Sequence, residues 1–269
     1  VDGLGSTPFF WRYRFPLRQR LLRLRVGRGL RNNAGVLVNS SHTRTRLKTT
    51  FPKLDRPIYV IPPGLSEAYF SEPSVEQRKD SEQRDGPLRM LTIARLSNIA
   101  RRKNVDGVLR ALASLRDELD FFYTVIGDGD HRSELEVLAS ELGIRDRVAF
   151  LGGISEEEKL RILDETDLFI MCSTASATDS EGFGIVYIEA AARGVPSLGS
   201  RNGGAVDAIG ENLTGRFVEH GEPKEIADEI RWFSHNLHRF SHKEISDFAK
   251  KFAWSNIASR IASLVTPQT

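Results

Sequence analysis

The sequence predicts an α/β protein built on a doubly wound, Rossmann-like parallel sheet. From about Leu88 onward, short apolar runs rich in β-branched and aromatic residues alternate with stretches whose apolar residues recur at helical spacing. This alternation is typical of parallel strands joined by helices. The chain has 269 residues, enough for one large domain or two of ordinary size. Its composition, 40% apolar and 28% charged, is that of an ordinary globular protein and excludes a collagen-like or disordered chain.

Five strands and five helices are expected in this part of the chain. The strands are expected at residues 90–94, 121–126, 148–151, 168–171 and 196–198, and the helices at 104–119, 131–142, 155–164, 186–193 and 223–234. The buried face of the first helix is expected to consist of Val105, Val108, Leu109, Leu112, Leu115 and Leu119, which recur at intervals of three and four. Ligands of doubly wound sheets bind beside the carboxyl ends of the strands, so a site is expected in the loops that follow them.

The remaining residues divide the chain. Residues 35–39 and 57–61 are expected to form two strands around a helix that begins near Ser41, but 1–66 are too few for a second complete doubly wound domain. Residues 1–66 are therefore expected to form an incomplete N-terminal α/β domain. Prolines, glycines and a dense polar stretch predict a linker at 67–87, followed by a Rossmann-like domain at 88–240 and C-terminal helices at 241–269. Trp254, Ile257, Ile261 and Leu264 are expected on one side of the last helix.

Charge is distributed unevenly along the chain. Residues 1–50 carry eleven Lys and Arg against one Asp, a balance of +10, whereas the rest carries 27 basic and 35 acidic residues, a balance of −8. The segment from Arg12 to Arg31 interleaves arginine with leucine, which is typical of stretches that bind anionic membrane surfaces. The alternatives are a solvated basic face, or a helix whose apolar face packs on its own domain.

Membrane spans and secretion signals are not expected. No uncharged apolar run approaches the roughly 18 residues of a spanning helix, and the N-terminus lacks the apolar core of a secretory signal. A cytoplasmic location is therefore expected, with peripheral association at the inner face of the plasma membrane as an option. The single cysteine, Cys172, excludes a disulfide scaffold and a cysteine-based zinc site, and is expected to be a small buried apolar residue.

The most informative stretch runs from Glu181 to Glu189, with the sequence EGFGIVYIE. Gly182 and Gly184 permit close approach of the backbone, so N–H groups at the start of the following helix can bind a phosphate. Glu189 falls inside an apolar helix, where an unpaired carboxylate is costly. Either a ligand diol, which a carboxylate binds through two hydrogen bonds, or a neighbouring backbone group or arginine is expected to satisfy it.

A basic cluster follows the first strand of the sheet. Arg95 comes directly after the strand, and Arg101, Arg102 and Lys103 precede the next helix. Cations at the end of a parallel strand, beside a helix N-terminus, can bind a diphosphate and offset the charge that develops on a departing one. A solvated loop is the alternative.

These two motifs are part of a longer series of short motifs that extends from about residue 35 to residue 265. The others are Val38-Asn-Ser-Ser, Val60-Ile-Pro-Pro-Gly64, Val125-Ile-Gly-Asp-Gly129, Val148-Ala-Phe-Leu-Gly152, Gly203-Gly204, Thr214-Gly215 and Phe252-Ala-Trp254. The set resembles the retaining nucleotide-sugar glycosyltransferases of glycosyltransferase family 4, which have the GT-B fold. The resemblance implies transfer of a hexosyl unit, with retention, from a GDP- or UDP-linked sugar to a saccharide or lipid-linked acceptor in cell-surface polysaccharide or glycolipid synthesis. It implies no other cofactor and no metal.

The resemblance also assigns roles to residues. Arg95 and Lys103 would bind the diphosphate, Glu181 would contact the sugar ring, and Glu189 would bind the ribose. The other donor-binding residues would be Gly182, Phe183, Gly184 and Ile185 around the phosphates, and Gly127, Val148 and Leu151 beside the nucleobase. Lys103 lies eight positions after Arg95, a long spacing, so Arg101 or Arg102 remains open as the working cation. The glycine-rich loop and histidine of the family's N-terminal domain are not visible, so the chain is expected to lack roughly half of that domain.

Other readings remain open. A GT-B sugar-nucleotide epimerase would use the same donor site without an acceptor, and a non-catalytic nucleotide-sugar-binding protein would bind the donor without turning it over. Nucleic acid is not expected as a partner, because no known nucleic-acid fold accompanies the basic segment. Asp128-Gly-Asp130 and the histidines 235, 238 and 242 have the residue types of metal sites, but they are expected to form a turn and a surface.

Overall fold

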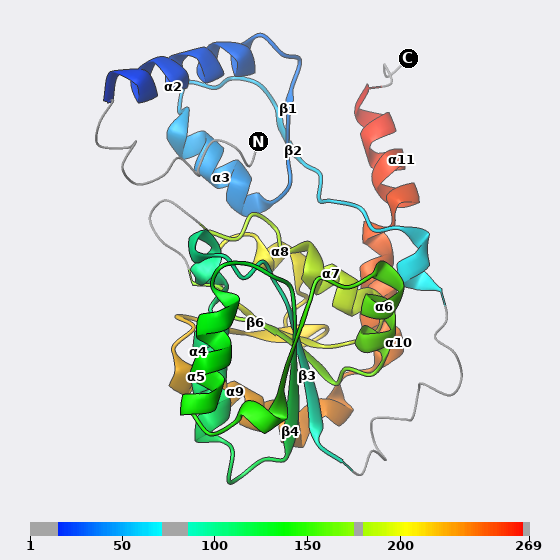
Figure 1. The fold of residues 1–269 in the computed structure, drawn as a ribbon. Helices are drawn as coiled ribbons and strands as arrows, with labels where there is room; N and C mark the ends of the chain where they lie inside the picture. The colour runs from blue at the N-terminus through cyan, green and yellow to red at the C-terminus, as the bar shows by residue number, and fades with distance from the viewer. Residues whose placement is uncertain (1–15, 72–85, 175–179, 266–269) are drawn as a thin grey trace.

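A computed structural model describes residues 16–71, 86–174 and 180–265. A parallel sheet of six strands forms its centre, in the order β5-β4-β3-β6-β7-β8, with helices on both sides (Figure 1). The strands are β3 (Leu88–Ile93), β4 (Phe121–Ile126), β5 (Val148–Gly152), β6 (Leu168–Met171), β7 (Ser197–Ser200) and β8 (Gly215–Val218). The predicted doubly wound sheet is confirmed, and its strand order reverses between β3 and β6.

Eight α-helices accompany these strands within the described ranges. They are α4 (Val105–Ser114), α5 (Arg132–Glu141), α6 (Glu156–Asp164), α7 (Ile185–Ala192), α8 (Ala205–Ala208), α9 (Pro223–Asn236), α10 (His242–Ala249) and α11 (Trp254–Val265). Short 3-10 helices are η2 (Glu67–Phe70), η4 (Asn98–Lys103), η5 (Arg145–Arg147), η6 (Leu237–Arg239) and η7 (Lys250–Phe252). We call residues 86–253 the sheet unit.

The core lies between the sheet and its helices. Every residue of β6 and β7 is buried, as expected for central strands covered on both faces. Val108, Leu109 and Leu112 of α4 are fully buried, as predicted, but α4 ends at Ser114, so Leu115 and Leu119 of the predicted face follow the helix. Cys172 is also fully buried, as predicted.

Strand β8 and helix α8 are not among the elements predicted from the sequence. Strand β8 has only four residues and begins with Gly215 and Arg216, which carry no strand signal. Helix α8 has one turn. Helices α10 and α11 lie within residues 241–269, where C-terminal helices are predicted, and α10 buries Ile245 and Ala249.

A smaller N-terminal unit, residues 16–60, precedes the sheet unit. It consists of α2 (Pro16–Arg31), β1 (Val36–Val38), α3 (Ser41–Thr50) and β2 (Ile58–Val60), with β1 and β2 paired in parallel. These strands and the helix starting at Ser41 agree with the sequence prediction. The Ser40 hydroxyl caps α3 by accepting a hydrogen bond from the Thr43 N–H at 3.1 Å.

The connecting segment, residues 61–71, joins the two units and packs against the end of the chain. The Leu65 N–H donates to the Phe252 carbonyl at 2.8 Å, and the Trp254 N–H donates to the Leu65 carbonyl at 3.0 Å. From there α11 runs back toward the N-terminal unit (Figure 1), where Arg260 donates to the Val60 carbonyl at 3.1 Å. Residues 67–70, expected to be linker, form η2 instead, and its Tyr69 is buried.

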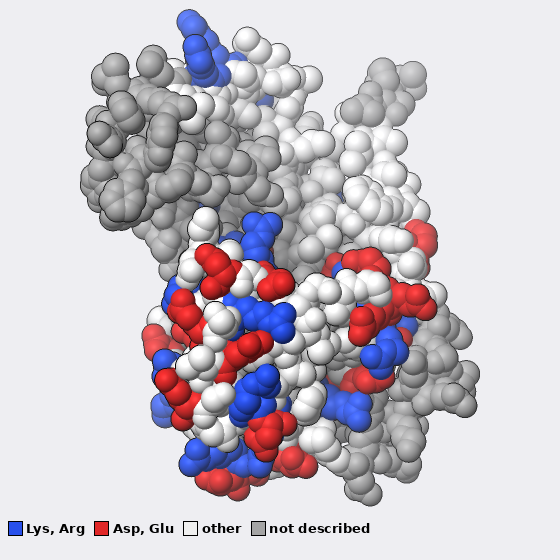
Figure 2. Space-filling model, viewed as in Figure 1, with Lys and Arg blue, Asp and Glu red and all other residues white. Residues whose placement is uncertain are grey.

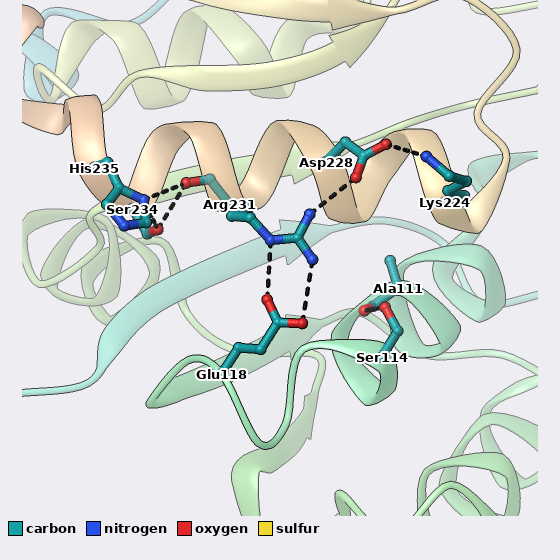
Figure 3. Close-up of polar contacts among 8 residues, drawn as sticks. All are labelled: Ala111, Ser114, Glu118, Lys224, Asp228, Arg231, Ser234 and His235. Carbon is teal, nitrogen blue, oxygen red and sulfur yellow. Dashed lines mark hydrogen bonds and ion pairs between the residues drawn. The ribbon is translucent and has the colours of Figure 1, made fainter.

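The outer surface of the sheet unit carries charges of both signs. Figure 2 shows basic and acidic side chains interspersed over the face that α4 and α5 occupy in Figure 1. On α9, Arg231 donates to Glu118 at 3.0 and 3.4 Å and to Asp228 at 2.9 Å (Figure 3). Such exposed pairs contribute at most about 1 kcal/mol each. Within the described ranges, no helix is both long and apolar enough to cross a membrane.

Candidate active site

The loops after β3 and β6 meet where the strand order of the sheet reverses. The Thr174 N–H donates to the Arg102 carbonyl at 2.7 Å, and the Asn104 side chain donates to the Cys172 carbonyl at 3.0 Å. Asn104 has a φ of 60°, in the left-handed region that asparagine tolerates better than most residues. The two loops are therefore joined at the point where doubly wound sheets bind ligands.

This junction places two cations on one carboxylate. The Lys103 Nζ lies 2.5 Å from Glu181 Oε2, and Arg102 Nη1 lies 3.1 Å from the same oxygen. All three side chains are largely buried, with exposed fractions of 16%, 24% and 10% for Lys103, Arg102 and Glu181. Burial by itself raises the pKa of the Glu181 carboxyl, but the charges of Lys103 and then Arg102 outweigh it and hold this pKa below its ordinary value. The cluster carries one net positive charge.

Helix α7 begins directly after this cluster. Its N-cap, Gly184, has a φ of +83°, and a Cβ there would lie 2.5 Å from the Tyr187 ring. No side chain among the described residues caps this helix, so its first N–H groups can bind an anion. The Gly204 N–H donates to the Glu181 carbonyl at 2.7 Å, and a Cβ on Gly204 would lie 2.1 Å from the Gly182 carbonyl. The predicted glycine turn thus permits this close backbone packing.

Glu189 lies on the second turn of α7 in a cluster of three other side chains. Its Oε1 accepts from the Tyr69 hydroxyl at 3.1 Å and from Lys159 Nζ at 3.3 Å. The Tyr69 hydroxyl has a single proton, which it shares between Glu189 and Glu156, whose Oε2 lies 2.7 Å away; Lys159 lies 2.9 Å from Glu156. Glu189 is 8% exposed, and its Oε2 is buried with no hydrogen-bond partner among the described residues. This oxygen is a buried acceptor without a donor in an otherwise satisfied cluster.

The other predicted cations lie outside the Glu181 cluster. Arg95 is exposed at the end of β3 and forms no hydrogen bond with the residues that the structure describes. Arg101 is half-exposed and pairs with Glu134 at 2.5 Å. Of the two alternatives left open for the working cation, the structure brings Arg102 to the cluster.

The predicted nucleobase residues are only partly brought together. The Gly127 N–H donates to the Gly152 carbonyl at 2.8 Å, and Leu151 is 40% exposed beside this contact. Val148 begins β5, pairs with Tyr123 and is buried in the core. It therefore lies at the far end of β5 from the loops that form the site.

Around α7, Ile185 is partly exposed in the first turn. Phe183 is buried against Phe252, with ring centroids 5.7 Å apart.

The N-terminal unit contributes residues that the sequence analysis missed. His42 Nε2 lies 2.8 Å from the Ser180 hydroxyl, next to Glu181, and Arg46 donates to the same hydroxyl at 3.2 Å. Burial, then the charge of Arg46, lowers the pKa of His42. A cleft of about 250 Å³ lies between the units, and its lining residues are Asn39, Ser41, Val60, Pro62, Phe183, Asp207, Lys251, Phe252 and Arg260.

The sequence held one usable signal for these missed residues. His42 and Arg46 follow one predicted parallel strand and Lys159 follows another. Because ligands of doubly wound sheets bind beside the carboxyl ends of the strands, all three were candidates for the site. Tyr69 lies in a stretch without periodicity and carries no such signal. Among the described residues, no group of three His, Cys, Asp or Glu side chains can hold a metal ion.

The family model of glycosyl transferases group 1 matches residues 74–252, which include both loops of the site and both glutamates. The chain belongs to this family. The resemblance drawn from the sequence motifs is thereby confirmed, and the matched range includes all but the last residue of the sheet unit.

Similar proteins agree with this assignment. The chain is 33% identical over 218 residues to the GDP-mannose-dependent alpha-(1-6)-phosphatidylinositol monomannoside mannosyltransferase of Mycobacterium tuberculosis, covering 80% of this chain and 55% of that protein. It is 30% identical over 246 residues to the alpha-monoglucosyldiacylglycerol synthase of Streptococcus pneumoniae, covering 88% and 54%. The chain thus spans about half the length of the curated relatives it matches.

A solved structure confirms the fold. The sucrose-phosphate synthase from Thermosynechococcus elongatus superposes with a TM-score of 0.77 at 23% identity, over 93% of this chain and 62% of that one. The fold is that of GT-B glycosyltransferases, as the resemblance implied.

Proposed function

We propose that the protein transfers a hexosyl unit from a nucleoside diphosphate sugar to a saccharide or lipid-linked acceptor in glycolipid or polysaccharide synthesis, with retention at the anomeric carbon. The observation that carries the proposal is the contact of Lys103 and Arg102 with Glu181, where the strand order reverses and α7 begins. This arrangement combines cations, open N–H groups and an ionised carboxylate around one point.

Each group has a role that follows from its charge. Lys103 and Arg102, with Arg95 at the mouth of the loop and the N–H groups of residues 183–185, bind the diphosphate. Cleavage of the sugar–phosphate bond places negative charge on the diphosphate, which these groups stabilise. Glu181 accepts hydrogen bonds from the sugar hydroxyls and Glu189 binds the ribose through Oε2. These cations take the place of a divalent metal, so EDTA is expected to leave donor affinity unchanged.

GDP-mannose is the donor we propose, with UDP-glucose as the alternative. The support is the relative from Mycobacterium tuberculosis, whose name specifies GDP-mannose and which is 33% identical. By the same comparison, a phosphatidylinositol-type glycolipid is the acceptor class to test first. Incubating the protein with donor alone distinguishes an epimerase from a transferase, since only an epimerase alters the donor without an acceptor.

Helix α2 supports a peripheral membrane association at the inner face of the plasma membrane. It contains six arginines and no acidic residue, and its Leu22 and Leu24 are 47% and 59% exposed. Such a helix binds anionic headgroups and inserts its leucines at the interface. Co-sedimentation with phosphatidylglycerol vesicles, but not with phosphatidylcholine vesicles, is the expected result. If a variant with Arg25 and Arg28 changed to Glu no longer sediments with these vesicles, α2 is the element that binds the membrane.

Calorimetric titration with GDP, UDP, GDP-mannose and UDP-glucose tests the donor site. We expect binding of one base, and a loss of at least about tenfold in diphosphate affinity in Lys103→Met. Lys243→Met is the matched control, because Lys243 is 86% exposed and pairs with Asp247 on α10. Absence of binding by every nucleotide, or equal affinity of wild type and Lys103→Met, would contradict the proposed function.

A further inference from the structure

Tyr69 belongs to the connecting segment but its side chain lies inside the sheet unit. It is 6% exposed, and its hydroxyl lies between Glu156 of α6 and Glu189 of α7. The roles assigned above to the donor site do not use it. A buried polar group requires hydrogen-bond partners, and the Tyr69 hydroxyl finds them in these two carboxylates.

The backbone around Tyr69 is held by a buried ion pair. Arg193 donates to the carbonyls of Tyr69 at 3.1 Å and Ser71 at 2.6 Å. The same guanidinium donates to both carboxylate oxygens of Asp164 at 2.7 Å, and side-chain exposure of the two residues is 3% and 6%. The segment is therefore fixed to α6 and α7 at the level of Glu189, and the Tyr69 ring has a defined position.

The protons of this cluster determine which carboxylate oxygen remains open. The one proton of the Tyr69 hydroxyl is shared between Glu156 at 2.7 Å and Oε1 of Glu189 at 3.1 Å, and one of the three Lys159 protons reaches the same Oε1 at 3.3 Å. Burial and then the Glu189 charge raise the pKa of Tyr69, so the phenol stays protonated and serves as a donor. No donor among the described residues reaches Oε2.

We infer that Tyr69 is a positioning residue for nucleoside binding: its hydroxyl, with Lys159, holds Oε1 of Glu189 so that Oε2 faces a ribose hydroxyl. This inference rests on the proposed function, in which Glu189 binds the ribose. It adds that the segment between the two units sets the orientation of the ribose-binding carboxylate. The contribution of Tyr69 therefore depends on the presence of the ribose hydroxyls.

The test compares, for each variant, the affinity for a ribonucleotide with the affinity for its dideoxy analogue. GDP and 2′,3′-dideoxy-GDP, or the uridine pair if UDP binds more tightly, are titrated calorimetrically into wild type and Tyr69→Phe. The Phe variant keeps the ring, and Tyr123→Phe is the matched control because its buried hydroxyl donates to Thr92 at 2.7 Å in the sheet core. Thermal unfolding of each variant verifies that it is folded.

We expect wild type to favour the ribonucleotide by about tenfold or more, since hydrogen bonds to a charged group are strong. In Tyr69→Phe, affinity for the ribonucleotide is expected to fall about five- to tenfold, and affinity for the dideoxynucleotide less than about twofold. Tyr123→Phe should match wild type with both ligands. A merely structural effect of Tyr69 would weaken both ligands equally.

Two results would overturn the inference and can be told apart. If wild type binds ribonucleotides and Tyr69→Phe shows the same preference for ribose, or loses both ligands equally, Tyr69 does not position Glu189 and the proposed function stands. If wild type binds neither nucleotide of either pair, the proposed function fails and the inference fails with it.

Discussion

The ammonium of Lys103 lies 2.5 Å from the carboxylate of Glu181, although 78 positions separate the two residues in the sequence. Lys103 ends the loop after β3 and Glu181 follows the loop after β6, and β3 pairs with β6 in the sheet. Parallel pairing brings the carboxyl ends of both strands to one edge, so the two loops meet there.

The ion pair predicts an acid-sensitive contribution to stability. The folded-state pKa of Glu181 is below its ordinary value of 4.5, so the ionised carboxylate stabilises the fold above that value. This contribution is lost as pH falls from about 4.5 through the lower folded-state pKa. Between pH 7 and pH 3, the free energy of unfolding should therefore decline more in wild type than in Glu181→Gln, as measured by urea unfolding.

The control for this prediction is Glu134→Gln, since Glu134 is 55% exposed and pairs with the half-exposed Arg101. Its pH dependence should follow that of wild type. Parallel curves for wild type and Glu181→Gln would show that the pair does not stabilise the ionised carboxylate.

Gly184→Ala should destabilise the fold at the glycine turn before α7. The φ of +83° and the 2.5 Å approach of the Tyr187 ring leave no strain-free place for a methyl group. We expect a loss of about 1–3 kcal/mol in the free energy of unfolding, together with weaker nucleotide binding. Gly29→Ala in α2 is the control, because no atom lies within 4 Å of its added Cβ. An unchanged unfolding curve for Gly184→Ala would refute the strain argument.

Arg193→Met should be among the most damaging single substitutions in the sheet unit. It leaves Asp164 buried without its cation and removes the donors to the Tyr69 and Ser71 carbonyls. Loss of one partner of a buried pair costs about 3–5 kcal/mol. Arg231→Met removes an exposed pair with Glu118 and should cost less than about 1 kcal/mol. Equal effects of the two substitutions on urea unfolding would contradict this account.

Asp207→Ala should loosen the contact between the two units. The Asp207 carboxylate accepts a hydrogen bond from the Ser41 N–H in the first turn of α3, where negative charge is favourable. We expect faster hydrogen exchange at the α3 amides and a loss of about 1 kcal/mol or less in the free energy of unfolding. Asp228→Ala on α9 serves as the control and should leave exchange in α3 unchanged, whereas equal protection of α3 in both variants would argue against this contact.

The sequence by itself determined the doubly wound sheet, the glycine turn before α7 and the two glutamates, because periodicity and local motifs carry these features. It also predicted that a basic group follows β3, but not whether Arg101 or Arg102 accompanies Lys103. That choice depends on how the loop, shaped by η4 and the left-handed Asn104, directs consecutive side chains. Only the tertiary structure decides it, with Arg101 turned to Glu134 and Arg102 to Glu181.

The tertiary structure likewise decided the surroundings of Glu189. Its burial follows from the apolar helix that contains it, and the sequence alone predicts the need for a partner. The partners, Tyr69 and Lys159, come from segments 120 and 30 positions away. Tyr69 lies in a stretch whose prolines and polar residues give no periodic pattern. Its position depends instead on Arg193, because a buried guanidinium must satisfy its donors and finds the carbonyls of the connecting segment.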